Sequence, residues 1–302
     1  MSLSEDLRNE LAAIAPRQEC DRLAELSGLF HAAGSVHLRG RGEVSVHLDV
    51  ASSAIARRAF SLLRAFGVAS EIRTYRRRAF DRAARYQLHV GGDAHALQVL
   101  HEAGVLTAAL APLERPPKRV VARSCCRGAY LRGALLGSGS LSGPRSPHLE
   151  LRTSTVAGAE FLAGVAAAEG VTLAVVDRGR YAAAYAKGAE AIADTLSAAG
   201  ASDAVLAFEE RAVLGATRAG ANRLANADHA NLVRTSRAAH DQIRALRRLD
   251  LDQLPPKLRE IAELRLRHPT LPLRELALRC DPPATKSVAH RRLRKLVRLA
   301  DL

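Results

Sequence analysis

The sequence predicts an α+β fold in which one pattern of helices and strands occurs twice and a small all-helical domain follows. Two helix-to-strand segments repeat with an offset of 105 residues, and the segments after each copy come in the same order. Residues 250–302 contain amphipathic helices and no strand pattern. A long period in two copies indicates a pseudo-two-fold domain rather than a solenoid.

The first repeated element is a helix rich in small residues. Residues 21–34 (DRLAELSGLFHAAG) and 126–139 (CRGAYLRGALLGSG) both end at glycine and lead into strand-like sequence. Each helix carries two small residues four positions apart, which lie on one face and allow two backbones to approach closely. We therefore expect the two helices to pack against each other along the pseudo-axis. The spaced pairs are Gly28 with Ala32 and Gly133 with Gly137.

The remaining elements complete each half as αββαββα. After a first strand, each half continues with an Ala-rich helix, two strand candidates and a closing helix that ends at glycine. In the first half these are strand 47–50, helix 53–66, strands 69–77 and 84–90, and helix 93–103. In the second half they are strand 148–151, helix 155–169, strands 171–177 and 180–186, and helix 188–199. The expected boundaries are an N-terminal helix over 1–19 and halves over 20–112 and 120–205.

The rest of the chain reads as helices. Residues 206–249 are expected to form a linker that ends in a basic helix at Leu232–Leu249. Residues 250–302 predict three short helices with a tight turn before the third, which is the helix-turn-helix arrangement. Thr285 is a suitable N-cap for the third helix. The three helices are expected at Lys257–Arg267, Leu273–Arg279 and 286–300.

The net charge of +14 is concentrated in this second part. Residues 211–302 carry +11 and residues 1–210 only +3. The third helix has six positive side chains, no negative one, and an apolar stripe at helical spacing. A basic excess at one end indicates a module that binds a polyanion, although a charge that only aids solubility is the alternative. The apolar stripe consists of Ala289, Leu293, Leu296, Val297 and Ala300.

The third helix supplies the predicted DNA contacts. In a helix-turn-helix, the first residues of this helix reach base edges in the major groove, and arginine suits bidentate contact with guanine. The other readings are a solvated face on a structural helix, or a helix on an anionic membrane, which the lack of large aromatic anchors disfavours. The expected base readers are Lys286, Ser287, His290 and Arg291, with Thr285 beside them and Arg294 next along. The expected phosphate contacts are Arg292, Lys295 and Arg298.

Two further groups of polar residues have alternative interpretations. In the linker, Arg223, Asn226 and Asn231 either belong to a polar connection or contact DNA or the neighbouring domain. In the first half, four arginines either reach phosphates from the strands or lie in a solvated hairpin turn. These arginines are Arg73, Arg76, Arg77 and Arg78.

Several classes of protein are disfavoured. No apolar run approaches the roughly 18 residues that a membrane span needs, and the acidic N-terminal segment does not resemble a signal peptide. None of the four cysteines belongs to a CxxC pair, so the spacing indicates reduced thiols, with no metal, cofactor or disulfide framework. We expect a cytoplasmic protein. The cysteines are Cys20, Cys125, Cys126 and Cys280.

The repeated helix resembles the LAGLIDADG motif of homing endonucleases. The two copies are Leu26–Gly34 (LSGLFHAAG) and Leu131–Gly139 (LRGALLGSG). In active members of that family, the acidic residue before the last glycine binds the catalytic divalent metal. Here the matching positions are Ala33 and Ser138, which offer no anionic oxygen. The resemblance therefore implies the fold and argues against the nuclease activity, because a two-metal nuclease needs these carboxylates.

The whole chain resembles the WhiA family of bacterial transcription regulators. The resemblance implies a regulator of cell division, chromosome segregation and, in sporulating species, sporulation, which binds promoter DNA at the nucleoid and works with a possible co-regulator protein. The alternatives are an active LAGLIDADG endonuclease, an RNA-binding maturase, or a protein-interaction scaffold with a vestigial DNA-binding tail. The matching stretches are CCRGAYLRGALLGSGSLS (125–142), ANRLANADHANLVRT (221–235), LPPKLREIAELRLRHP (254–269) and HRRLRKL (290–296).

Overall fold

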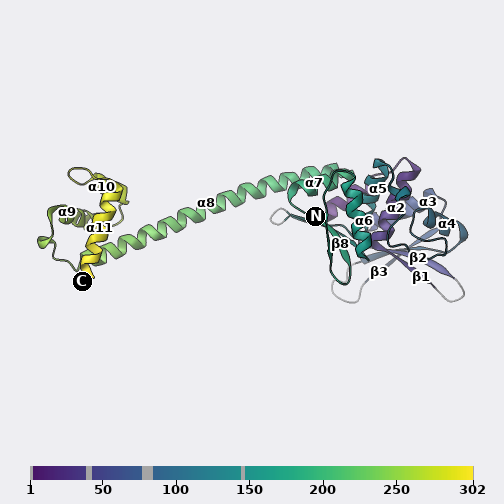
Figure 1. Cartoon of the computed structure of the whole chain (residues 1–302), viewed down its shortest axis with the longest axis horizontal. Helices are drawn as coiled ribbons and strands as arrows, with labels where there is room; N and C mark the ends of the chain where they lie inside the picture. The colour runs from purple at the N-terminus through teal and green to yellow at the C-terminus, as the bar shows by residue number, and fades with distance from the viewer. Residues whose placement is uncertain (1–2, 39–42, 77–83, 144–146, 302) are drawn as a thin grey trace. The chain divides into compact units, whose positions relative to one another are not determined.

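The computed structural model describes residues 3–38, 43–76, 84–143 and 147–301. The chain divides into two compact units, Met1–Ala216 and Thr217–Leu302 (Figure 1). Each unit has a hydrophobic core of its own. Among the helices of these described ranges, none has the length and apolar character needed to cross a membrane.

The first unit contains the duplicated αββαββα pattern, which confirms the prediction. Helix α1 (Leu3–Ala13) precedes it, and each half opens with a 15-residue helix, α2 (Glu19–Ala33) or α5 (Ser124–Ser138). The first half continues with β1 (Gly34–Leu38), β2 (Val44–Val50), α3 (Ser53–Ala65), β3 (Ser70–Arg76), β4 (Ala84–Val90) and α4 (Ala94–Glu102). A short 3-10 helix, η2 (Lys118–Val121), leads to α5. The second half continues with β5 (Ser140–Ser142), β6 (His148–Thr153), α6 (Val156–Ala167), β7 (Ala174–Asp177), β8 (Ala182–Lys187) and α7 (Ala189–Ala198).

Each half forms one antiparallel sheet, and the two sheets have the same strand order. The orders are β1-β2-β4-β3 and β5-β6-β8-β7. In the first sheet, Leu48 of β2 lies opposite Leu88 of β4 and both are fully buried in the core. The next pair in the register is Asp49 with Gln87, whose side chains point to the other face because successive residues of a strand alternate. Each sheet therefore has an apolar face against the helices and a polar open face.

Helices α2 and α5 pack at a backbone distance that only glycine permits. A Cβ atom added to Gly28 would lie 2.2 Å from the carbonyl oxygen of Tyr130, and one added to Gly133 would lie 2.2 Å from that of Glu25. At Gly137 an added Cβ would lie 2.8 Å from the Cβ of Ala32. These contacts confirm the predicted close approach of the two repeated helices. They also show that α2 and α5 run in the same direction.

A buried ionic cluster joins three helices beside this contact. The fully buried carboxylate of Glu25 accepts hydrogen bonds from Arg58 of α3 at 2.6 and 2.9 Å. The same carboxylate accepts one from Arg132 of α5 at 2.9 Å. Because the two guanidinium groups neutralise and hydrogen-bond the carboxylate, the charge can remain inside the core.

The second unit is entirely helical in its described residues. Helix α8 (Ser202–Leu246) begins in the first unit and ends in the second. It is continuous through the segment expected to include a polar linker, because that segment contains no proline and is rich in alanine and arginine, both strong helix formers. The core consists of apolar residues from α8, α9 (Pro256–Arg267), α10 (Leu273–Leu278) and α11 (Lys286–Ala300), with η3 (Leu251–Gln253) between α8 and α9.

Candidate nucleic-acid interface

Helix α11 begins and packs as its sequence predicts. The side-chain oxygen of Thr285 accepts a hydrogen bond from the backbone N–H of Val288 at 3.3 Å, which satisfies one of the free donors at the helix start. Ala289, Leu293 and Leu296 are fully buried in the core of the second unit. Burial of this stripe fixes the rotation of the helix and leaves the opposite face in solvent.

The exposed face of α11 is basic along its whole length. All but one of its predicted DNA-contacting side chains are exposed, and the helix contains no acidic residue. The face therefore presents a positive stripe beside an uncharged serine and a histidine. The exposed residues are Thr285, Lys286, Ser287, His290, Arg291, Arg294, Lys295 and Arg298.

Among the predicted DNA-contacting residues of α11, Arg292 is the one that points toward α9 instead of solvent. Its side chain is 20% exposed, and its Nη1 lies 3.7 Å from the Oε2 of Glu260 on α9. Position 292 directly precedes the buried Leu293, so its aliphatic stem lies at the edge of the core. This geometry favours a role in holding α11 against α9 over the expected phosphate contact.

Hydrogen bonds to α10 and from α9 hold the chain before α11 in place. The backbone N–H of Ala284 donates to the carbonyl of Ala277 at 2.9 Å, which closes the chain between α10 and α11. Arg265 of α9 is buried and donates from Nη1 to the carbonyl of Leu271 at 2.7 Å. Desolvation lowers the pKa of its guanidinium. The start of α11 is therefore carried on a fixed framework, as a reading helix requires.

A basic pocket of about 350 Å³ lies between α8 and the start of α11. The side chains around it include Arg234 of α8, Arg274 of α10, and Lys286 and His290 of α11. The Nη2 of Arg234 donates to the Oδ1 of Asn231 at 2.5 Å. Asn231, for which the sequence left a polar linker and a contact with DNA or the neighbouring domain as alternatives, thus orients an arginine of this pocket. Local patterns did not indicate the pocket, because its cations come from four separate helices, with Arg265 of α9 as a further member.

The remaining predicted contacts are dispersed. Arg223 and Asn226 are exposed on α8. In the first unit, the Nη2 of Arg73 lies 2.7 Å from the Oε2 of Glu71 on the same strand, so its charge is already paired. Arg76 is exposed at the end of β3, and Arg77 and Arg78 lie outside the described residues.

The open face of the first sheet carries mixed polar groups instead of a basic stripe. His89 Nδ1 and His47 Nε2 lie 2.8 Å apart, and the rings of His37 and His47 are 4.2 Å apart. Burial, followed by the neighbouring histidines, lowers the pKa of His47. The hydroxyl of Tyr75 donates to the carboxylate of Asp49 at 2.9 Å. Acidic and imidazole side chains share the described part of this face, so its charge is more mixed than that of the exposed face of α11.

The positions that would hold a catalytic metal lie at the C-terminal ends of α2 and α5. Ala33 has no ligand atom. The hydroxyl of Ser138 donates to the carbonyl of Arg152 at 2.8 Å and accepts from the N–H of Arg152 at 2.9 Å, so it anchors β6. Within the described ranges, the one cluster with metal-ligand reach lies elsewhere, at the N-terminal ends of the same helices: Cys20, Asp21, Cys125 and Cys126.

For the cysteines, the sequence prediction of no metal site rested on their spacing along the chain, whereas the fold brings together residues that are 105 positions apart. All four cysteines of the chain are free thiols. Burial, with hydrogen bonds to the neighbouring thiols, raises the pKa of Cys126 to about 12. The metal-free thiol is therefore not a reactive thiolate.

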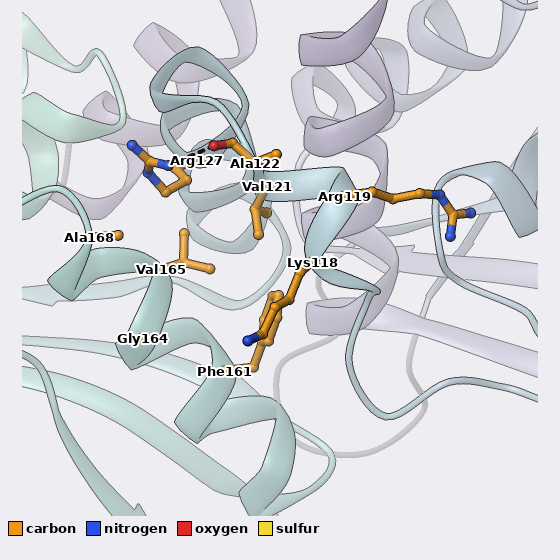
Figure 2. A pocket seen from close by; sticks show the side chains of 9 residues that line it. All are labelled: Lys118, Arg119, Val121, Ala122, Arg127, Phe161, Gly164, Val165 and Ala168. Atoms are coloured by element: carbon orange, nitrogen blue, oxygen red, sulfur yellow. Dashed lines mark hydrogen bonds between the residues drawn. The ribbon is translucent and has the colours of Figure 1, made fainter.

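A separate pocket of about 550 Å³ lies between η2, α5 and α6 (Figure 2). Val121, Phe161 and Val165 supply apolar walls, and Lys118 lies at the pocket. Arg127 is held by Glu169, with its Nε 2.5 Å from the Oε1, while Arg119 extends away from the other lining residues in Figure 2. The apolar walls distinguish this pocket from the basic pocket beside α11.

Three family models match the chain in succession. The model of the WhiA N-terminal LAGLIDADG-like domain matches residues 19–106, and that of the WhiA LAGLIDADG-like domain matches residues 127–218. The model of the WhiA C-terminal HTH domain matches residues 221–300. The two halves and the helix-turn-helix are thus each matched in the order in which the structure places them.

Relatives and solved structures agree with these matches. The probable cell division protein WhiA of Heliobacterium modesticaldum is 37% identical over 100% of this chain and 96% of its own length. The protein of the same description from Symbiobacterium thermophilum is 35% identical over 100% of this chain and 98% of its own length. The crystal structure of full-length WhiA from Thermatoga maritima has a TM-score of 0.58 at 21% identity, covering 100% of this chain and 98% of that one.

A duplicated LAGLIDADG-like domain joined to a helix-turn-helix defines a class of protein in which a homing-endonuclease fold accompanies a DNA-binding module. Within this class, the chain belongs to the WhiA family. Its LAGLIDADG-like domain has Ala33 and Ser138 at the two positions where the resemblance to homing endonucleases predicts acidic residues.

Proposed function

We propose that this protein is a sequence-specific DNA-binding transcriptional regulator that reads the major groove with α11. The observation that carries the proposal is the exposed basic face of α11, from Lys286 to Arg298, opposite a fully buried apolar stripe. A helix that served only structure would not need one sign of charge along its exposed face. A duplex supplies the matching row of phosphates together with base edges.

In the proposed complex the exposed residues have two roles. Lys286, Ser287, His290, Arg291 and Arg294 lie on the first turns of α11 and read bases, because the N-terminal part of the third helix enters the groove. Lys295 and Arg298 follow toward the C-terminus and bind phosphates, which adds affinity without sequence information. The pocket cations Arg234 and Arg274 extend the phosphate-binding surface beyond α11.

The test compares two charge-matched double variants. Arg291→Ala with Arg294→Ala should weaken binding to a promoter fragment by roughly 5- to 150-fold for each arginine that reads a base. Arg57→Ala with Arg64→Ala removes two exposed arginines from α3, on the helical side of the first sheet, and should leave binding within about twofold. Fluorescence anisotropy with the full chain measures both. Equal binding by the two variants would remove α11 as the reading helix and favour the scaffold alternative.

The proposed regulator binds DNA without cutting it. Ala33 offers no oxygen and Ser138 is engaged with Arg152, so neither position supplies a carboxylate for a divalent metal. The full chain should leave a supercoiled plasmid that carries its promoter intact in Mg²⁺ or Mn²⁺. Cleavage that chelation abolishes would establish the endonuclease alternative. Tighter binding to intron RNA than to promoter DNA would establish the maturase alternative.

We further propose that the regulated genes serve cell division, chromosome segregation and, in sporulating species, sporulation, and that the protein acts at promoters on the nucleoid in the cytoplasm. The description of the relatives as probable cell division proteins supports the role in cell division. Genome-wide mapping of sites bound by the wild-type chain and by the Arg291→Ala, Arg294→Ala variant tests it. Sites enriched at such promoters should vanish in the variant. A co-regulator protein should be recovered from the same crosslinked complexes.

A further inference from the structure

Four potential metal ligands meet at the N-terminal ends of α2 and α5. Cys20 and Asp21 come from the first turn of α2, and Cys125 and Cys126 from the first turn of α5. Their ligand atoms all lie within 4.8 Å of one another. The offset of 105 residues that relates the two halves relates Cys20 to Cys125 and Asp21 to Cys126. The cluster is therefore made of two symmetry-related pairs that face each other across the pseudo-axis.

The distances match the edges of a tetrahedron around zinc. With Zn–S bonds of about 2.3 Å, two sulfur ligands lie about 3.8 Å apart, and a sulfur and a carboxylate oxygen about 3.5 Å apart. The Sγ atoms of Cys125 and Cys126 are 3.8 Å apart, and the Sγ of Cys20 lies 3.6 Å from the Oδ1 of Asp21. The widest separation of 4.8 Å shortens to such an edge by side-chain rotation of about 1 Å, without movement of the helices.

The surroundings suit anionic ligands. Gln18 and Arg123, the N-cap residues of α2 and α5, make no side-chain cap hydrogen bond. Both helices therefore present the positive ends of their dipoles to this cluster, which favours the anionic form that the ligands adopt when a metal binds. Cys126 is buried, Cys20 is half-buried, and Cys125 is exposed. The site thus has a closed floor and an open side through which a metal can enter.

From this geometry we infer that Cys20, Asp21, Cys125 and Cys126 form a structural zinc site that ties the two LAGLIDADG-like halves together at the N-terminal ends of their central helices. Three thiolates and one carboxylate fill the four positions of a structural zinc centre. Soft thiolates select zinc over Mg²⁺, which prefers oxygen ligands. The site is independent of DNA reading by α11. It is also distinct from the degenerate nuclease positions Ala33 and Ser138, which lie about 20 Å further along the same helices.

A disulfide is the competing use of these thiols. Cys125 and Cys126 are consecutive residues of a helix, whose Cα atoms are about 3.8 Å apart, closer than the range in which disulfides form. A disulfide between Cys20 and either Cys125 or Cys126 is less hindered, because these residues lie on different helices. Such a bond would use two of the three thiols and leave no tetrahedral set for zinc, so the two outcomes exclude each other.

The experiment measures metal binding by the full chain purified under reducing conditions. The wild-type protein should contain about one zinc per chain by elemental analysis. The zinc-free protein titrated with Co²⁺ should develop thiolate-to-cobalt charge-transfer and d–d absorption bands. Cys20→Ala and Cys126→Ala should each lower zinc affinity at least about tenfold and abolish the cobalt spectrum. Cys280→Ala, which changes a buried cysteine in the core of the second unit, should retain both.

Stability provides a second readout. Zinc should raise the Tm of the wild-type chain in a concentration-dependent way, because a ligand that binds only the folded state stabilises it. Asp21→Asn keeps the size of the side chain and removes its charge, so it should fold and yet bind zinc at least about tenfold more weakly. A wild-type chain that gives no cobalt spectrum would overturn the proposal. So would a Cys20 disulfide in the mass spectrum of the native protein, or zinc retained by the cysteine variants.

Discussion

Replacement of Gly28 by alanine should loosen the contact between the two halves. The new methyl carbon would lie 2.2 Å from the carbonyl oxygen of Tyr130 and 2.9 Å from the backbone nitrogen of Ala134. Both are backbone atoms of a buried helix and cannot rotate away. Helices α2 and α5 must therefore separate by about 1 Å to restore van der Waals contact.

The magnitude follows from two opposing effects. Forcing a methyl group into a packed core costs up to about 3 kcal/mol, while alanine favours the helix over glycine by about 1 kcal/mol. We expect Gly28→Ala to lower the free energy of unfolding of the first unit by about 2 kcal/mol. For a unit of this size, that decrease corresponds to a fall in Tm of about 4 to 8 °C. Urea and thermal unfolding followed by circular dichroism measure it.

A double variant and a control make the reasoning refutable. An added Cβ at Gly133 meets Glu25 at the same 2.2 Å, so one separation of the helices accommodates both methyl groups. The double variant should be destabilised by about 1 kcal/mol less than the sum of the single variants. Gly164→Ala, on the exposed face of α6 with no atom within 4 Å, should raise stability by about 0.5 to 1 kcal/mol. If Gly28→Ala behaves like Gly164→Ala, or if the double variant is additive, the close contact is wrong.

Three further results are expected. Glu25→Ala should lower the free energy of unfolding by about 3 to 5 kcal/mol in urea titrations, because Arg58 and Arg132 remain buried without their shared carboxylate. Replacement of all three residues by apolar ones should restore most of that stability. Burial lowers the pKa of His31 in the folded chain, so the unfolded chain binds this proton more readily as the pH falls through 6.5. Stability should therefore fall as the pH drops from 7 to 5. His31→Phe should flatten that slope in thermal scans, and an unchanged slope would contradict the reasoning. Arg298→Ala should weaken all duplexes alike and reduce the log–log salt slope of binding by about 1, whereas a change in sequence preference would make Arg298 a base reader.

The sequence was sufficient to predict features that depend on the spacing of residues within one helix. The spacing of Gly28 and Gly133 predicted the helix contact, and the stripe from Ala289 to Leu296 predicted the rotation of α11. Both inferences need only the geometry of one helix and a duplicated sequence. The structure of the segment around Asn226 was harder to predict, because three asparagines favour turns while the surrounding alanine-rich sequence favours a helix. In the structure the segment is helical and belongs to α8.

The features that sequence reasoning missed depend on contacts between distant elements. Arg292 belongs to the basic helix by sequence, yet its place beside Leu293 brings it to Glu260 of α9. The pocket that contains Arg234 and Lys286 requires the end of α8 to lie against α11. The cysteine cluster did have a signal, since the register that pairs Gly28 with Gly133 also pairs Cys20 with Cys125. Applying the duplication to every residue type, and not only to the motif, would have found it.

The distribution of constraints along α2 and α5 explains how this fold can be retained without nuclease chemistry. The middle of each helix holds the backbone contact at Gly28 and Gly133 and the ionic cluster around Glu25, and these interactions determine how the halves pack. At the C-terminal ends, Ala33 packs at the edge of the core and Ser138 hydrogen-bonds to the backbone of Arg152, roles that need no acidic side chain. Two carboxylates brought together there would repel each other unless a metal bound them. Uncharged residues at these two positions avoid that repulsion and are accommodated by the packing of α2 and α5.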